Sequence, residues 1–377
     1  MKNFILFTTV LFVIFLIYSC TKTATDEILI GEYGSLTGSE ATFGISSNNG
    51  LKLAVEEINS SGGLLGRKIK LITYDDQGKP SEAQTVVQRL IKNDKVIAVI
   101  GEVASSRSKA GAPICQQNKI PMITPASTNP EVTAIGDYIF RVCFIDPFQA
   151  TVLTKFATNS LKVKKVAILK DVKNAYSTGL SDFFEKEFRE AGGEILEVQS
   201  YSAGDKDFKA QLTAIKSKNP EAIFIPGYYT DVGLIAIQAR EIGLTVPLFG
   251  GDGWESEKLT EGKAKDALEG CYFSTHVSTE NPDPRIQDFI QKYRTKYNMM
   301  PDAMSFLAYD AGMILFDAIK RAGSTESAKI RDELARTKDF PGVTGKITIN
   351  EQRNAVKPAV ILQIKDGKFT YKETIQP

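Results

Sequence analysis

The 377-residue sequence predicts an α/β protein with two lobes, each built on a doubly wound parallel sheet. Short runs rich in β-branched residues alternate with amphipathic helical stretches, which is typical of βαβ units. The alternation pauses at residues 138–144 and resumes at residues 163–169, so the chain contains two successive series of such units. The chain is also long enough for two domains of ordinary size.

The elements of the first series follow from hydrophobic periodicity. Apolar residues recur at helical spacing in residues 51–58, and Gly62 and Gly63 stop that helix. The expected strands are Ile28–Glu32, Ile69–Tyr74, Val96–Ile100 and a short run near residues 120–124, and the expected helices are Gly50–Asn59 and Ser81–Asn93.

The second series repeats this pattern and is followed by further elements. Its expected strands are Lys165–Leu169, Ile195–Gln199, Ala222–Ile225 and Pro247–Phe249, and its expected helices are Ser177–Ala191, Asp207–Lys218 and Asp231–Ile242. Two more helices are expected at Pro284–Tyr297 and Ser305–Ala322, and two final strands at Ala359–Ile364 and Lys368–Lys372.

The N-terminus reads as a targeting segment. Lys2 precedes an apolar stretch at residues 4–17, which is shorter than the roughly 20 residues that a membrane-spanning helix needs. Residues 17–20 resemble a bacterial lipoprotein cleavage site, with a tyrosine at an unusual position. We therefore expect a signal peptide at residues 1–19, a lipidated Cys20 and a polar tether at residues 20–26. A plain signal peptide cut nearby, or an uncleaved anchor, is the alternative.

Composition and motifs favour binding over catalysis. Lys and Arg number 46 and Asp and Glu number 45, so the charge balance gives no reason to expect a nucleic-acid partner. The sequence lacks H-E-x-x-H, G-x-S-x-G, a P-loop and a dinucleotide fingerprint, so we expect no enzyme, metal or cofactor. The single histidine, His276, is expected to be structural. Cys115, Cys143 and Cys271 form an odd set, for which buried free thiols are the expectation.

Small hydroxyl residues follow two neighbouring strands. Ser105 and Ser106 come after the run at Val96–Ile100, and Ser127 and Thr128 come after the next strand. Ligands of doubly wound sheets bind at the carboxyl ends of the strands, and a helix N-terminus favours a carboxylate. The sequence therefore predicts a site for a small anion or zwitterion, although serine and threonine at such places also serve as helix caps.

Several sequence blocks carry a family resemblance. The segments GEVASS and MITPASTNPEVT, the earlier YDDQGKPSEA, and the blocks at residues 31–38, 54–63, 227–229 and 308–311 occur in an order that resembles the periplasmic binding proteins for leucine, isoleucine and valine. These proteins serve ABC transporters. The resemblance extends from Ile28 to about Phe369 and implies the type I periplasmic binding protein fold, with two lobes joined by a three-stranded hinge.

The resemblance assigns roles to individual residues. Ser105 and Thr128 would hold a ligand carboxylate, and the Ala126 carbonyl and Asp252 would hold an ammonium group. Asp252 stands where the family commonly has a longer glutamate, and between glycines it could instead be a turn residue.

Aromatic residues would form the wall of the site. Tyr176 and Tyr228 would supply this wall from lobe two, unless they are ordinary surface or hinge aromatics. Phe43 stands where some relatives have tyrosine. Met304 and Phe306 are weaker candidates for the same pocket, and Asp75 with Asp76 is expected to anchor a loop.

The resemblance also implies a domain division and a function. Lobe one would comprise residues 27–141 and 276–346, and lobe two residues 142–275 and 347–377, with crossings near 141, 273–277 and 345–348. The protein would lie in the periplasm or at the cell surface on its lipid anchor. It would capture a small branched-chain or aliphatic amino acid by hinge closure and deliver it to an ABC permease. The alternatives are a sensor of the same fold with a signalling partner, and amides, urea or aromatic acids as ligands.

Overall fold

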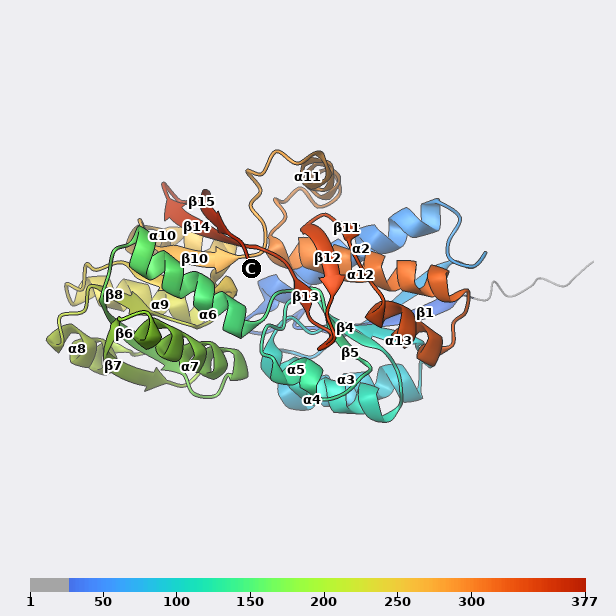
Figure 1. The fold of residues 1–377 in the computed structure, drawn as a ribbon, viewed down its shortest axis with the longest axis horizontal. Coiled ribbons are helices and arrows are strands. Elements are labelled where there is room, and N and C mark those ends of the chain that lie inside the picture. The colour runs from blue at the N-terminus through green and yellow to red at the C-terminus, as the bar shows by residue number, and fades with distance from the viewer. Residues whose placement is uncertain (1–26) are drawn as a thin grey trace, which may run out of the picture.

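Two lobes lie side by side in the computed structural model, each with its own sheet (Figure 1). The structure describes residues 27–377. The predicted signal peptide, Cys20 and the tether at residues 20–26 lie outside the described residues. No helix within residues 27–377 is long and apolar enough to cross a membrane.

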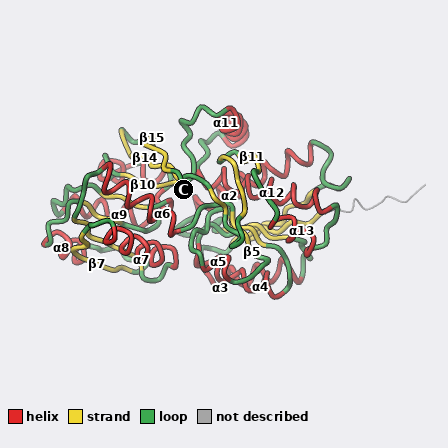
Figure 2. The backbone as a smooth tube through the Cα atoms, viewed as in Figure 1, coloured by secondary structure: helices red, strands yellow, loops and turns green. Residues whose placement is uncertain are grey.

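Lobe one is built on a sheet whose five described strands are all parallel, in the order β2-β1-β3-β4-β5. The strands are β1 (Ile28–Gly34), β2 (Ile69–Asp75), β3 (Ala98–Ile100), β4 (Met122–Thr124) and β5 (Ile139–Arg141). The helices are α2 (Ala41–Ser60), α3 (Pro80–Lys92), α4 (Ser105–Gln117), α5 (Glu131–Ala134), α11 (Pro284–Tyr297), α12 (Ala303–Ala322) and α13 (Ser327–Ala335). Helices α3 and α4 cover one face of the sheet, and α2 and α12 cover the other (Figure 2). The chain leaves β1 first toward β2 and then toward β3, so the point where the order reverses lies between β1 and β3.

Lobe two is built on a seven-stranded sheet of described residues, in the order β15-β14-β10-β9-β8-β6-β7. The strands are β6 (Lys165–Asp171), β7 (Glu194–Tyr201), β8 (Ala222–Phe224), β9 (Leu248–Gly250), β10 (Tyr272–Thr275), β14 (Ala359–Lys365) and β15 (Lys368–Ile375). The helices are α6 (Asp146–Lys155), α7 (Ala175–Glu190), α8 (Lys209–Ser217), α9 (Tyr229–Glu241) and α10 (Gly262–Ala267). Strands β6 to β10 are parallel, whereas β14 and β15 extend the sheet in antiparallel order.

Helix α2 begins at Ala41, earlier than the expected Gly50. The added turns are rich in Ser, Asn and Gly, which have low helix propensity, so local sequence did not predict them. Tertiary contacts hold them, because a Cβ atom at Gly44 would lie 2.1 Å from the Ser35 carbonyl oxygen and the Ser46 hydroxyl donates a hydrogen bond to Asp302. By contrast, the predicted helix Pro284–Tyr297 has the bounds of α11.

A small antiparallel sheet precedes the last two strands. It consists of β11 (Phe340–Gly342), β12 (Gly345–Ile349) and β13 (Ala355–Val356). Its residues contact lobe one, because the Thr344 N–H donates to Asp310 on α12 and the Thr133 hydroxyl lies 2.9 Å from the Asn354 side chain. We therefore propose that the third crossing follows Val356, later in the chain than the expected residues 345–348.

The three cysteines of the described chain are free and buried, as expected. Burial raises the pKa of Cys143 to about 12 and raises the pKa values of Cys115 and Cys271 as well. These thiols are therefore protonated at neutral pH and act as small apolar side chains in the core. Residues 27–377 contain no group of three or more His, Cys, Asp or Glu side chains suited to a metal ion.

Candidate functional site

All six residues that the sequence analysis placed in a binding site line one pocket between the lobes. They are Ser105, Ala126, Thr128, Tyr176, Tyr228 and Asp252, and the wall is completed by Phe43, Val103, Gly253 and Met304. The empty space of the pocket, counted up to its mouth, is about 210 Å³. The lobes thus lie close together over the site.

Ser105 and Thr128 come from lobe one, just after β3 and β4. Neither acts as a helix cap. The Ser105 hydroxyl accepts a hydrogen bond from the Asn129 N–H at 3.2 Å, and the cap of α4 is Ala104 without a side-chain bond. The Thr128 hydroxyl lies near Asp146 but makes no hydrogen bond of good geometry with any described residue. Both residues are buried and line the pocket, so their hydroxyls can donate to a ligand there.

The neighbouring hydroxyls have other tasks. Ser127 bonds to the backbone carbonyls of Glu102 and Val103, at 2.9 and 3.0 Å, and so joins the two loops that carry the site. The Ser106 hydroxyl accepts a hydrogen bond at 2.9 Å from the N–H of Ala175, which begins α7 in lobe two. Ser106 therefore links the lobes and does not line the pocket.

Asp252 enters the pocket from lobe two, immediately after β9. Its carboxylate does not bond to its own turn. Instead, Gln149 donates to one oxygen at 2.9 Å, and His276 Nε2 lies 3.2 Å from the other. The Asp252 side chain is 4% exposed. These two partners fix a buried carboxylate beside the space where a cationic group can bind, and sequence reasoning did not identify Gln149 as one of them.

His276 lies directly after β10, in the segment that leads to α11. Burial lowers its pKa below the ordinary value, although the nearby Asp252 opposes that shift. The ring is stacked on Phe144, with centroids 3.8 Å apart. At neutral pH His276 is therefore uncharged, and it orients Asp252 without neutralising it.

Aromatic side chains form one wall of the pocket. The rings of Tyr176 and Tyr228 are stacked with centroids 5.4 Å apart, and Phe43 of lobe one meets Tyr228 edge-on at 5.7 Å. The Tyr176 hydroxyl accepts a hydrogen bond from the Gly253 N–H at 3.2 Å. Met304 also lines the pocket, whereas Phe306 does not, because it packs on Phe289 in a separate cluster. This wall suits an apolar group.

The lobes are also joined by hydrogen bonds beside the pocket. The Tyr229 and Thr230 hydroxyls, at the start of α9, both donate to the Ser39 carbonyl oxygen, at 2.9 and 2.8 Å. Asn129 of lobe one donates to the Ala175 carbonyl at 2.8 Å. The structure is therefore a closed form, in which polar contacts link the loops of lobe one to the helix starts of lobe two.

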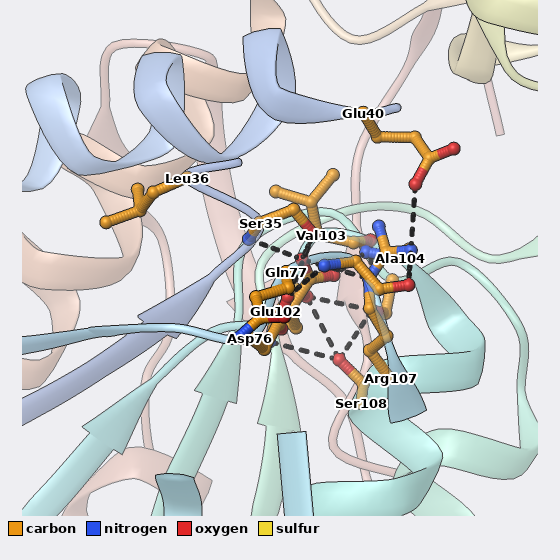
Figure 3. A network of polar contacts seen from close by, with 12 residues as sticks. Ser35, Leu36, Glu40, Asp76, Gln77, Glu102, Val103, Ala104, Arg107 and Ser108 are labelled. Atoms are coloured by element: carbon orange, nitrogen blue, oxygen red, sulfur yellow. Dashed lines mark hydrogen bonds and ion pairs between the residues drawn. The ribbon is translucent and has the colours of Figure 1, made fainter. Parts of the chain in front are cut away.

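A buried ionic network supports the loops of lobe one (Figure 3). The Arg107 guanidinium lies 3.1 Å from Glu40 and 3.2 Å from Glu102. The Ser35 hydroxyl lies 2.9 Å from Glu102 and 3.0 Å from Asp76. One cation therefore connects the loops that follow β1, β2 and β3, which are the loops nearest the point where the strand order reverses.

The predicted anchoring role of the acidic pair after β2 agrees with its contacts. Asp75 accepts hydrogen bonds from the N–H groups of Leu36, Thr37 and Gln77. Asp76 accepts one from the Gly78 N–H at 2.9 Å. Burial and the nearby Glu102 raise the pKa of Asp76 to about 7, so part of the excess negative charge of the network is removed by protonation.

Stability should depend on pH through the buried Glu255, which accepts a hydrogen bond from the Ala303 N–H at the start of α12. Burial and the nearby Asp302 raise its pKa to about 8. Between about pH 4.5 and 8 the folded protein keeps a proton that the unfolded chain has lost, so this contribution to stability falls as pH rises through that window. We expect Glu255→Gln to match the parent in melting temperature at pH 5 and to exceed it at pH 8.5. The exposed Glu190→Gln should change neither value, and a Glu255→Gln difference independent of pH would contradict the shift.

Comparison with known proteins places these observations in a family. The sequence profile of a family described as periplasmic binding protein matches residues 27–368. The chain is 32% identical over 349 residues to a Leu/Ile/Val-binding protein homolog of Brucella melitensis, which covers 92% of this chain and 94% of that protein.

Solved structures agree in fold. A leucine-binding protein, LivK, from Thermotoga maritima superposes with a TM-score of 0.88 at 40% identity, covering 93% of this chain and 99% of that one. The branched-chain amino-acid binding protein LivJ of Streptococcus pneumoniae, solved in complex with isoleucine, also gives 0.88, at 34% identity over 93% of this chain and 100% of that one.

Proposed function

Because the chain belongs to the periplasmic binding protein family, we propose that it captures an aliphatic, branched-chain amino acid between its lobes and delivers it to an ABC permease. The observation that carries this proposal is the pocket itself. The hydroxyl residues Ser105 and Thr128 of lobe one and the buried Asp252 of lobe two line it, together with apolar and aromatic side chains. A zwitterion with an apolar side chain matches this arrangement. The pocket would bind this ligand without catalysing a reaction.

The head group of the ligand would use both lobes. Its carboxylate would accept hydrogen bonds from the Ser105 and Thr128 hydroxyls and from the free N–H groups near the start of α4. Its ammonium group would donate to Asp252 and to the Ala126 carbonyl. The aliphatic side chain would then lie against Phe43, Tyr228 and Met304, which are apolar or present an apolar ring face.

Ligand capture would proceed by hinge closure. Ser105 and Thr128 belong to one lobe and can bind the carboxylate while the cleft is open. Tyr228 and Asp252 belong to the other lobe and make their contacts only on closing, so the ligand favours the closed form by its differential contacts. The permease would then recognise the closed surface formed by the two lobes.

A thermal-shift screen of residues 27–377 tests the function. A ligand that binds only the folded protein raises the melting temperature by mass action. We expect leucine, isoleucine and valine to give the largest shifts among amino acids, amides, urea and aromatic acids. Larger shifts from an amide or an aromatic acid, with none from leucine, would exclude the branched-chain assignment.

Ser105→Ala should weaken leucine binding about ten- to hundredfold, because it removes a hydrogen bond to a charged group worth roughly 1.5–3 kcal/mol. Stopped-flow binding should show the loss mainly in the capture step, since Ser105 lies in the lobe that meets the ligand first. The exposed Ser81→Ala on α3 serves as the control and should bind like the parent. Unchanged binding by both Ser105→Ala and Thr128→Ala would place the site elsewhere.

The family is extracytoplasmic, and we propose that this chain is held at its membrane by lipid on Cys20, which lies outside the described residues. The support is the short apolar stretch ending at Ser19 and Cys20. Cys20→Ala should leave an unprocessed precursor and abolish labelling with a fatty-acid analogue in cells. Labelling of the variant at the level of the parent would rule out this anchor.

A further inference from the structure

Arg141 is a fully buried cation behind the binding loop. It is the last residue of β5, where the chain first leaves lobe one, and its exposed fraction is 0%. The guanidinium donates hydrogen bonds to the Ser127 carbonyl, to the Asn129 carbonyl at 2.8 Å and to the Thr133 hydroxyl at 3.1 Å. Arg141 therefore binds backbone on both sides of Thr128.

These bonds fix the direction of the loop. The Thr128 carbonyl accepts a hydrogen bond from the Asp146 N–H at 3.0 Å, so the carbonyls of Ser127, Thr128 and Asn129 all bond to the segment 141–146. The Thr128 hydroxyl, by contrast, lines the pocket and has no hydrogen bond of good geometry. The backbone acceptors are thus turned away from the place where a ligand carboxylate would bind, and a donor is left facing it.

Arg141 also lacks a counterion within the described chain. No carboxylate of residues 27–377 forms a salt bridge with it, whereas Lys357, the buried cation of the third crossing, interacts with Asp310. Asp146 is the carboxyl group that interacts electrostatically with Arg141. Burial raises the pKa of Asp146 to about 8, so it is largely protonated at neutral pH. A guanidinium remains charged even when buried.

We infer that Arg141 is a positioning residue that makes the pocket selective for a carboxylate: it holds the Ser127–Asn129 loop and supplies a positive potential that the ligand's carboxylate balances. The inference rests on the proposed amino-acid ligand and explains why the pocket would select a zwitterion. Arg141 lies behind the Ser127–Asn129 loop of lobe one, and Asp252 lines the pocket from lobe two. A zwitterion can place its carboxylate at this loop and its ammonium group at Asp252.

Calorimetric titrations at neutral pH with leucine and leucinamide test this role, because the two ligands differ only in the carboxylate. We expect the parent to bind leucine more tightly than leucinamide. Arg141→Met should reduce this ratio of affinities at least about tenfold, because it weakens the binding of leucine far more than the binding of leucinamide. Arg141→Lys keeps the charge and loses the fork of donors, so it should bind both ligands less tightly and keep most of the preference.

Arg240→Met is the matched control. Arg240 also holds three backbone carbonyls, those of Ala267, Leu244 and Val246, but it lies in lobe two and does not line the pocket. Its loss should leave the preference unchanged. If Arg141→Met lowers the affinities for leucine and leucinamide by the same factor, the inference is overturned and Arg141 has a purely structural role. If Arg141→Met does not fold, loss of the preference in Arg141→Lys would overturn it as well. A parent that binds neither ligand would instead defeat the proposed function, and the inference with it.

Discussion

Removal of the α-amino group from leucine should weaken binding by about 3–5 kcal/mol, which is roughly a hundred- to several-thousandfold. The deaminated analogue, 4-methylpentanoate, keeps the carboxylate and the side chain. In the closed cleft it would leave the buried Asp252 carboxylate facing an apolar carbon chain. Gln149 and His276 satisfy part of that carboxylate but add no positive charge, since His276 is neutral at neutral pH. Calorimetry with the two ligands measures the difference.

Asp252→Asn tests whether Asp252 causes this effect. Asparagine has nearly the same shape and can keep hydrogen bonds to Gln149 and His276. We expect the variant to bind leucine far more weakly than the parent and to bind 4-methylpentanoate at least as well, which gives a large coupling energy in the double-mutant cycle. Equal affinities of the parent for the two ligands would remove Asp252 from the ammonium site.

Arg107→Met should lower the free energy of unfolding by about 3–5 kcal/mol, because breaking a buried ion pair leaves uncompensated charge. The Arg107 side chain is 5% exposed and faces Glu40 and Glu102, and Asp76 lies in the same network. Without the guanidinium these carboxylates repel one another in the loops that support the pocket. Urea unfolding of residues 27–377 measures the loss.

The control is an exposed arginine pair. Arg189 and Glu185 lie on the surface of α7, with the Arg189 side chain 50% exposed, so Arg189→Met should cost less than about 1 kcal/mol. The deficit of Arg107→Met should also shrink as the pH falls toward about 7, the pKa of Asp76 in the parent, because loss of Arg107 raises that pKa further and protonation then removes one of the repelling charges. A deficit no larger than that of Arg189→Met would show that Arg107 is dispensable for stability.

The α/β class was predictable because the hydrophobic periodicity of this chain is strong. The parallel strands β1, β2, β6 and β7 are bounded by turn residues, and α11 carries its own start and stop signals in Asp283 and Asn298. The start of α2 was missed because its first turns are stabilised by tertiary contacts, of Gly44 with Ser35 and of Ser46 with Asp302. The antiparallel strands β14 and β15 were predicted as strands, but their direction depends on contacts that periodicity does not contain.

The candidate site was predictable in part. Ser105 and Thr128 follow strands, so the general rule for doubly wound sheets identifies them, and the family resemblance was needed for Tyr176, Tyr228 and Asp252. Gln149 and Arg141 carried no local signal. Gln149 bonds to Asp252, which is far away along the chain, and Arg141 bonds to the backbone carbonyls beside Thr128. Only the folded chain brings these partners together.

A crystal structure of the protein crystallised with leucine tests most directly the claim that the pocket between the lobes binds a branched-chain amino acid. The account predicts leucine between the closed lobes, with its carboxylate at the Ser105 and Thr128 hydroxyls and its ammonium group at Asp252. The side chain should lie against Phe43 and Tyr228. Leucine bound elsewhere on the protein, or in this pocket with its carboxylate toward Asp252, would contradict the account.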